Sequence, residues 1–227
     1  MTRSFRPRLD ILPPEQRLLW PELGPAAGLG FVLYGGTAIA LRLGHRRSVD
    51  FDFFTEAPLD RDSIRSALPL LARGTVVQDQ REAWSVLVPG SGGEHSHVKV
   101  SFFGTISFGR VGEPDCTEDG VMQVASLADL MATKVKVVLQ RAEAKDYRDV
   151  ASMVRAGVSL ASGLGAAREM FGPSFQPSES LKALVFFGDG DLGTLSGEEK
   201  ATLVEAVAAV RSLPQIAVVS RRLGAGP

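Results

Sequence analysis

The chain has 227 residues, of which 44% are hydrophobic and 22% charged, and 25 Lys and Arg against 26 Asp and Glu give a formal net charge of −1. These values exclude an intrinsically disordered chain, which needs low hydrophobicity and high net charge. They also argue against a protein that coats nucleic acid through general basicity. The length allows one large domain, or one domain with an appendage.

Two further features favour a cytoplasmic location. The single cysteine, Cys116, cannot form a disulfide within the chain, which suits a reducing compartment. The Arg-rich start leads to Pro13 and Pro14 without an apolar segment, so it does not resemble a secretory signal. No stretch approaches the roughly 18 apolar residues of a membrane span, so no membrane partner is expected.

Early in the chain, the sequence predicts two short strands on either side of a helix. An apolar run stops at two glycines, a helix follows and ends at Gly44, and a basic loop leads to a segment where carboxylates alternate with apolar residues. The strand, glycine turn, helix, loop and second strand cover residues 31–34, 35–36, 37–43, 45–48 and 49–54.

The next part of the chain is predicted to form one helix and then several strands. An amphipathic helix over residues 60–72 is followed by strand candidates over 75–80, 83–88, 97–103 and 121–124. The short, glycine-containing connections favour antiparallel hairpins.

After residue 125 the pattern is almost wholly helical. Ser126 with Asp129, and Ser196 with Glu199, have the spacing of helix N-caps, and the helix after Ser196 is expected to end near Val210. The predicted fold class is therefore α/β (α+β). A small mixed sheet with helices occupies residues 1–125, and a helical region, 126–227, packs on it or continues it as one domain.

Two motifs indicate phosphate and metal chemistry. Where a strand enters a helix through Gly35 and Gly36, backbone N–H groups can approach an anion at the positive helix end, and Thr37 can cap the helix or donate to a phosphate. Asp50 and Asp52, two apart on a strand, share a face with Cα atoms about 6.5–7 Å apart. Such carboxylates suit Mg²⁺ or Mn²⁺ held together with substrate phosphates. Alone, each motif is more often a plain turn or a solvated strand face, but together they favour a site.

The segment from Tyr34 to Phe54 contains both motifs and resembles the signature of the AbiEii-type nucleotidyltransferases. These are toxins of bacterial toxin–antitoxin and phage-defence systems within the DNA polymerase β-like nucleotidyltransferase superfamily. The likeness continues through residues 125–134 and 145–149. It implies an NTP substrate, a divalent ion on Asp50 and Asp52, and a nucleotide site that includes Gly35, Gly36, Thr37, Arg46, Ser48 and Lys134.

Lys134 has an unusual position in its predicted helix. At 100° per residue it lies in the middle of an apolar stripe that includes Leu130 and Val138, so it needs a charge partner or must extend to solvent. The resemblance implies that nucleotide phosphates are that partner, whereas the alternative is a structural lysine that reaches solvent. Lys136, on the opposite face, is predicted to be a solvated surface charge.

An acidic residue in the following helix is also implicated by the resemblance. We favour Asp146, at the border of the apolar stripe, over Asp149, which is predicted to face away from it. Asp146 would act as a base for the attacking hydroxyl or would hold Lys134. The alternative is a surface ion pair of these acids with Lys145 or Arg148.

One departure from the wider superfamily concerns the number of carboxylates. Many polymerase β-like enzymes carry a third acid on a neighbouring strand, and Ser101 stands where that acid is expected. One ion shared with the phosphates is therefore easier to support than two. Basic residues close to the motifs, which we expect to contact phosphates or an RNA acceptor or else to form a solvated loop, are Arg42, His45, Arg46 and Arg47.

These observations lead to three functional hypotheses. The first is a metal-dependent nucleotidyltransferase that moves a nucleoside monophosphate from an NTP to a hydroxyl of an RNA (tRNA-like) or a protein, acting as a toxin with an antitoxin partner. The second is a nucleotide- or partner-binding module of the same fold without activity, which Ser101 would suit. The third, transfer to a small molecule such as an aminoglycoside, ranks lower because no acidic drug-binding cluster is evident.

Overall fold

The computed structural model describes residues 3–90 and 97–225, and these divide into two compact units. The first unit comprises the described residues of Met1–Gly109, Glu113–Ala125 and Arg221–Pro227, and the second comprises Arg110–Gly112 and Ser126–Ser220. One boundary therefore falls between residues 125 and 126, where the sequence changes character. The described residues after Ser220 belong to the first unit, although the sequence predicts that they are part of the helical region.

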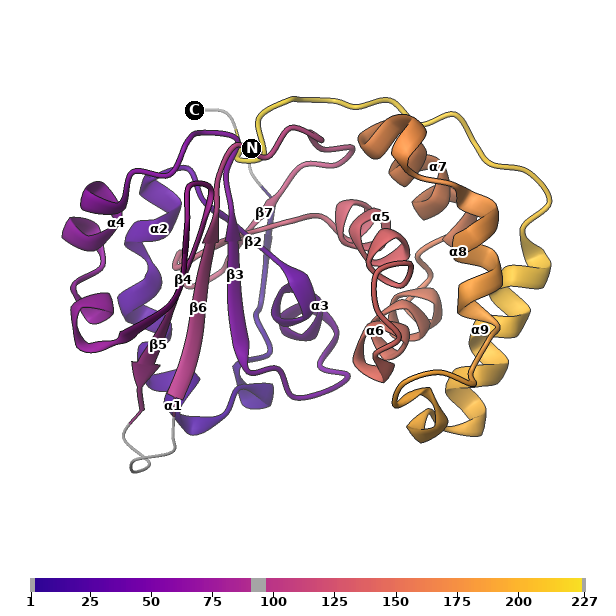
Figure 1. Cartoon of the computed structure of the whole chain (residues 1–227), viewed down its shortest axis with the longest axis horizontal. Helices are drawn as coiled ribbons and strands as arrows, with labels where there is room; N and C mark the ends of the chain where they lie inside the picture. The colour runs from indigo at the N-terminus through magenta and orange to yellow at the C-terminus, as the bar shows by residue number, and fades with distance from the viewer. Residues whose placement is uncertain (1–2, 91–96, 226–227) are drawn as a thin grey trace. The chain divides into compact units, whose positions relative to one another are not determined.

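The first unit is built on an eight-stranded mixed sheet with the order β1-β7-β8-β2-β3-β6-β5-β4 (Figure 1). Pairing is parallel for β1–β7, β2–β8 and β3–β6, and antiparallel for the other neighbours. This confirms the predicted fold class. The strands are Ser4–Phe5 (β1), Val32–Tyr34 (β2), Asp50–Phe54 (β3), Thr75–Gln80 (β4), Ala83–Pro89 (β5), His97–Phe103 (β6), Asp115–Thr117 (β7) and Gln123–Val124 (β8).

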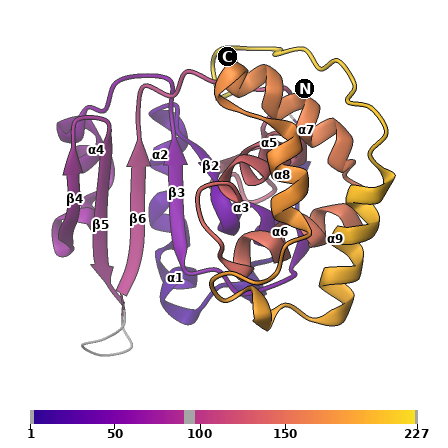
Figure 2. The same ribbon diagram turned by 45° about the vertical axis from the view of Figure 1, so that its right-hand side comes forward.

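The helices of the first unit lie on both faces of this sheet. They are Pro14–Leu19 (α1), Pro25–Gly28 (α2), Gly35–Leu43 (α3) and Arg61–Ala67 (α4). Figures 1 and 2 show α2 and α4 on one face and α3 on the other. The face towards α4 carries the aromatic core, in which Trp84 and Phe102 are buried and their rings lie 5.8 Å apart.

The predicted helix over residues 60–72 is interrupted. It ends at Ala67 and a 3-10 turn, Pro69–Arg73, follows. The reason is local, because a residue before proline disfavours the α conformation, and Leu68 has ψ 74°. Asp60 caps the first part, since its side chain accepts hydrogen bonds from the N–H groups of Asp62 and Ser63.

The second unit consists of helices. They are Leu127–Val137 (α5), Ala144–Arg155 (α6), Leu160–Phe171 (α7), Pro177–Leu184 (α8) and Gly197–Ala209 (α9). The Ser196–Glu199 capping box at the start of α9 is present as predicted. The described residues after Ala209 form no helix, so the prediction of an almost wholly helical end is wrong there. None of the helices in the described part of the chain has the length and apolar character to cross a bilayer.

Asp129 explains why Arg110–Gly112 belong to the helical unit. Its buried carboxylate accepts hydrogen bonds from the N–H groups of Val111 (2.7 Å) and Gly112 (3.2 Å) and from the Ser126 hydroxyl (2.5 Å). Ser126 in turn caps α5 by accepting from the N–H of Asp129. Burial raises the pKa of Asp129 in spite of these hydrogen bonds.

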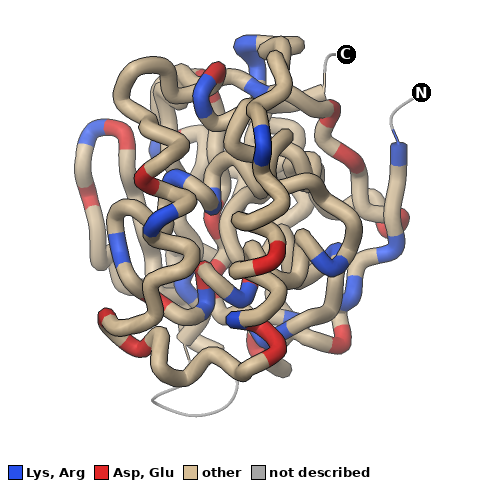
Figure 3. Tube along the Cα trace, turned by 90° about the vertical axis from the view of Figure 1, so that its right-hand side faces the viewer, with Lys and Arg blue, Asp and Glu red and all other residues tan. Residues whose placement is uncertain are grey.

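Basic and acidic residues are interspersed along the trace, as Figure 3 shows for the face drawn there. This mixture agrees with the near-zero net charge.

Candidate functional site

Strand β3 presents two carboxylates on one face of the sheet. Asp50 and Asp52 are half-buried, whereas Phe51 and Phe53 on the opposite face are buried. Phe53 stacks on Phe102 with ring centroids 5.4 Å apart. Because the apolar residues hold one face of the strand in the core, both carboxylates must point to the other face. The alternation read from the sequence is therefore correct.

Gly35 brings the start of α3 close to Asp52. Its φ of +73° lies in the region that favours glycine, and a Cβ at this position would lie 2.7 Å from the Asp52 Oδ2 atom. Gly36 is not among the glycines with positive φ in the described backbone. The helix begins at Gly35, so the predicted two-glycine turn reduces to one conformationally required glycine.

Thr37 does not cap α3. Its side chain is buried, its hydroxyl donates to the carbonyl oxygen of Asp50, and its Oγ1 lies 2.7 Å from the Ser48 Oγ, which is also buried. One hydroxyl has a single proton, so Ser48 is the donor in the second hydrogen bond. Thr37 and Ser48 thus fix the backbone at the first residue of β3, which positions Asp50.

The basic residues near the motifs divide into different roles. Arg42 pairs with Asp115 at 2.8 Å, donates to the carbonyls of Val124 and Ala125, and has a side chain that is only 9% exposed. Arg42 therefore ties α3 to β7 and to the end of β8. It is neither part of a solvated loop nor free to contact a phosphate, which were the two expectations for it. Arg46 remains half-buried and donates to the carbonyl of Arg47 at 2.9 Å.

A row of hydroxyl and amide groups continues from Asp52 across the sheet. Ser101 on β6 is in register with Asp52 and with Ser85 on β5, and the two serine hydroxyls are 3.1 Å apart. Ser85 also bonds to the Gln78 side chain on β4 at 3.1 Å. Ser101 therefore lies on the strand next to Asp52, where many polymerase β-like enzymes carry a third acid, and its side chain is buried.

The second unit contains a buried charge cluster around Lys134. Its Nζ lies 2.5 Å from the Asp146 Oδ1 and 2.7 Å from the Asp149 Oδ2, and both carboxylate side chains are fully buried. Arg141, whose side chain is 46% exposed, adds a 2.7 Å contact from Nε to the other Asp146 oxygen. We call these residues the Lys134 cluster.

The Lys134 cluster corrects the prediction for Asp149 and rules out the alternative in which Lys134 reaches solvent. Lys134 does not extend to solvent, because α6 supplies its partners from within the unit. Asp149 does not face away, since it is as buried as Asp146 and contacts the same ammonium group. The surface alternatives are also wrong, because Lys145 pairs with Glu143 and Arg148 with Glu199. The i, i+3 spacing of the two acids, which puts them on one helix face, could have indicated this.

Electrostatics keep Asp146 ionised. Burial acts to raise its pKa, but the hydrogen bond from Arg141 and the charge of Lys134 outweigh it and hold the pKa of Asp146 below its usual range. Lys136, predicted to be solvated, lies with its Nζ 4.0 Å from the centroid of the Phe171 ring.

The predicted residues thus form two groups, one in each unit. Gly35, Thr37, Ser48, Asp50 and Asp52 come together around the start of α3 and β3, and Lys134 and Asp146 come together between α5 and α6. The side chains that sequence reasoning missed are Ser85, Gln78, Arg141 and the buried Asp149.

Comparisons with known proteins concern the fold and the family of the chain. An uncharacterized protein of Aquifex aeolicus is 32% identical over 127 residues, which are 55% of this chain and only 58% of that protein. The solved structure of MenT4, a nucleotidyltransferase toxin of Mycobacterium tuberculosis, has a TM-score of 0.50 and 14% identity over 87% of this chain and 94% of MenT4, which shows a shared fold. The family described as nucleotidyl transferase AbiEii toxin, type IV toxin–antitoxin system, matches residues 24–191. The chain belongs to the AbiEii nucleotidyltransferase toxin family.

Proposed function

We propose that the protein transfers a nucleoside monophosphate from an NTP to a hydroxyl group of an RNA or protein acceptor, and that it acts as a cytoplasmic toxin controlled by an antitoxin. The observation that carries this proposal is the pair of half-buried carboxylates on β3, held next to the start of α3. The Asp50 carboxylate has no hydrogen-bond or ion-pair partner among the described residues, so it is available to a ligand.

The donor set fits a divalent ion. Asp50 and Asp52 offer carboxylate oxygens on one face, and such groups repel each other unless a cation joins them. No group of three or more His, Cys, Asp or Glu in the described ranges is placed to hold a metal. Mg²⁺ or Mn²⁺ would therefore share its ligands with nucleotide phosphates, as Mg²⁺ commonly does, and when bound it would neutralise phosphate charge.

Residues at the start of α3 are proposed to bind the triphosphate. The first turn of a helix has backbone N–H groups without intrahelical partners, which suit an anion, and Gly35 and Gly36 at the start of α3 have no side chains and are half-buried. Thr37 and Ser48 contribute by fixing Asp50, since both hydroxyls are already engaged with each other. Arg46 is proposed to contact a phosphate from the following loop.

The Lys134 ammonium group has three protons, and its contacts with Asp146 and Asp149 use two of them. Lys134 is proposed to donate the third to a phosphate oxygen. Asp146 is better suited to hold Lys134 than to act as a base, because a carboxylate with a lowered pKa accepts a proton poorly. Asp146 and Asp149 are therefore positioning residues in this proposal.

The reaction itself needs little covalent participation by the protein. The acceptor oxygen forms a bond to the α-phosphorus while the bond from that phosphorus to the β-phosphate oxygen breaks, pyrophosphate leaves, and the hydroxyl proton passes to solvent. Positioning and charge stabilisation supply most of the rate enhancement in such transfers.

The second candidate is a binding module with the same fold, which the buried Ser101 favours because no third acid completes the carboxylate set. Such a module would bind NTP without transferring it. A small-molecule acceptor remains the third candidate.

An α-phosphate-labelled NTP assay separates these candidates. The purified chain is incubated with each NTP, with Mg²⁺ or Mn²⁺, and with tRNA, total RNA, bacterial protein or an aminoglycoside. We expect label on RNA or protein, and a loss of about 100-fold or more in Asp50→Asn and Asp52→Asn. Asp62→Asn, at a side chain that is 98% exposed, is the matched control and should keep the activity. Tight NTP binding without transfer to any acceptor would establish the binding module instead.

A further inference from the structure

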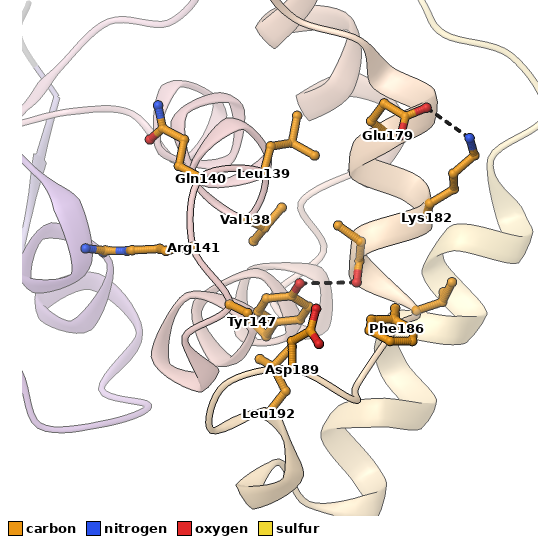
Figure 4. Close-up of a pocket in the computed structure, with 13 residues that line it drawn as sticks. Val138, Leu139, Gln140, Arg141, Tyr147, Glu179, Lys182, Phe186, Asp189 and Leu192 are labelled. Atoms are coloured by element: carbon orange, nitrogen blue, oxygen red, sulfur yellow. Dashed lines mark hydrogen bonds and ion pairs between the residues drawn. The ribbon is translucent and has the colours of Figure 1, made fainter.

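A cavity of about 750 Å³ lies within the second unit, between the end of α5, α6, α8 and the loop that precedes α9 (Figure 4). Its volume is in the range of small-molecule sites. None of the residues proposed to bind the nucleotide or the metal lines it.

The inner walls of the cavity are apolar and fixed. Val138, Tyr147 and Leu192 line it and are buried, and the Tyr147 hydroxyl donates to the carbonyl of Ala183 at 3.2 Å. The outer walls are apolar but exposed, since Phe186 is 57% and Leu139 39% accessible. Two aromatic rings, Tyr147 inside and Phe186 outside, therefore face the same space in Figure 4.

The loop that carries Asp189 is held in place. Gly190 has φ +53°, and its Cα lies so close to the carbonyl of Ala142 that a side chain would collide with it. Asp191 accepts a hydrogen bond from the N–H of Ala144 at 2.6 Å. The Phe186 ring packs over Gly188, where a Cβ would lie 2.9 Å from the ring Cζ. The loop thus presents Phe186 and Asp189 in a preformed arrangement.

The charges around the cavity leave one carboxylate for a ligand. Lys182 pairs with Glu179 at 2.9 Å. Arg141 extends away from the other labelled side chains in Figure 4, and its Nε pairs with Asp146 at 2.7 Å. Asp189 has no side-chain partner among the described residues and lies beside the Tyr147 ring in the same view. Its charge contributes, after burial, to the raised pKa of Tyr147.

We propose that this cavity binds a small organic cation, an ammonium or guanidinium group carried on an aromatic or aliphatic body. Aromatic faces attract cations and the Asp189 carboxylate adds a direct ion pair, while the apolar walls take up the body of the ligand. The proposal does not depend on nucleotidyl transfer, and binding is measured without it.

Binding is tested on the full chain with 2-phenylethylamine as the probe and 2-phenylethanol, its uncharged counterpart, as the reference. Isothermal titration and amide chemical shifts are the readouts. We expect the amine to bind roughly five- to tenfold more tightly than the alcohol, with shifts at Tyr147 and Asp189. Asp189→Asn should abolish this preference, and Phe186→Ala should weaken both probes. Glu198→Gln, at a side chain that is 79% exposed on α9, should change neither.

Equal affinities for the amine and the alcohol, or a preference that survives Asp189→Asn, would overturn the proposal, as would shifts confined to residues outside the cavity. A second arm uses the amide of acetyl-phenylalanyl-arginine. The proposal is supported only when a cation binds in the cavity more tightly than the alcohol and loses this preference in Asp189→Asn, and the tighter of the two cations then identifies the source as a free amine or a polypeptide side chain.

Discussion

The carboxylates on β3 and those in the Lys134 cluster belong to different units and are satisfied to different degrees. Asp50 and Asp52 are half-buried, and Asp50 has no partner among the described residues. Asp146 and Asp149 are fully buried, and a lysine lies between them. Two fully buried carboxylates need a cation, and the second pair has its cation within the fold.

This difference indicates a division of labour. A group that is already paired is well positioned but offers little new binding, while a group without a partner can bind a ligand at small cost to the fold. We therefore assign ligand binding mainly to Asp50, with Asp52 beside it on β3, and preorganisation mainly to the Lys134 cluster. Substitutions in the two regions should separate stability from activity, and the expected effects on stability are given from largest to smallest.

Replacing Lys134 by Met should have the largest effect, because it removes the ammonium group that contacts both buried carboxylates, those of Asp146 and Asp149. We expect a loss of about 3–5 kcal/mol in the free energy of unfolding, measured by urea denaturation. The double variant Lys134→Met/Asp149→Leu keeps the Arg141–Asp146 pair and should recover part of this loss. A single variant within about 1 kcal/mol of wild type would show that the buried charges do not depend on the lysine.

Gly35→Ala should cost less, about 1–3 kcal/mol, because alanine is strained at φ +73° and its Cβ would press on the Asp52 carboxylate. Urea denaturation measures the loss. Gly36→Ala is the control, since Gly36 does not have a positive φ and should lose no more than about 1 kcal/mol. Equal losses in the two variants would contradict the special role of Gly35.

Thr37→Val should destabilise by roughly 1–2 kcal/mol, because the buried Ser48 hydroxyl and the Asp50 carbonyl lose their shared partner. Thermal and urea unfolding test this, and Mn²⁺ affinity should fall as well if Thr37 positions Asp50. Thr202→Val removes a half-buried hydroxyl that bonds to the Glu198 carbonyl on α9, and should stay within about 0.5 kcal/mol. Unchanged Mn²⁺ affinity in Thr37→Val would remove the positioning role.

The pH dependence of stability should distinguish Asp146 from Asp129. The pKa of Asp146 is lowered on folding, so its contribution is present above the unfolded pKa and is lost as the pH falls through the folded pKa. Asp129 has a raised pKa, so its contribution is present at low pH and is lost as the pH rises through the raised value. The free energy of unfolding is measured for Asp146→Asn and Asp129→Asn from neutral to acid pH. As the pH falls, the difference between Asp146→Asn and wild type should shrink, whereas the difference between Asp129→Asn and wild type should grow. Parallel curves would contradict the assignment.

Asp50→Asn should have the smallest effect on stability, within about 0.5 kcal/mol, since the carboxylate is half-buried and bears no partner in the described structure. Mn²⁺ binding, followed by calorimetry, should be lost together with transfer. A stability loss as large as that of Lys134→Met would abolish the distinction between the two regions.

Much of the first region could be predicted from the sequence, because its signals are local. Alternation of Asp50, Phe51 and Asp52 fixes which side chains share a face, and the strands that form hairpins are bounded by turn residues. Parallel pairing of β3 with β6 joins segments far apart in the chain, and β1 and β7 have two and three residues, too few for a periodic pattern.

The Lys134 cluster was predicted only in part. Helical periodicity predicts that Lys134 lies on a buried stripe. The same method takes every polar helix face to be solvated, so it predicts that Asp149 lies at the surface. Here a polar face of α6 is buried because the opposing helix supplies a complementary charge. The role of Thr37 was missed for a related reason, since its partners, Ser48 and the Asp50 carbonyl, become neighbours only in the folded chain.

The segment after Ser220 has a consequence for how the molecule can be divided. Leu223 is buried in the first unit and its N–H donates to Glu56 at 3.0 Å, while the N–H of Ala225 donates to Gln123 at 3.0 Å. The helical unit is therefore an insertion whose two ends both connect to the sheet unit. A fragment that ends at residue 125 therefore lacks Leu223, which is part of the core of the sheet unit. The sheet unit keeps this core only if the tail after Ser220 stays attached, for example through a short linker that replaces residues 126–220.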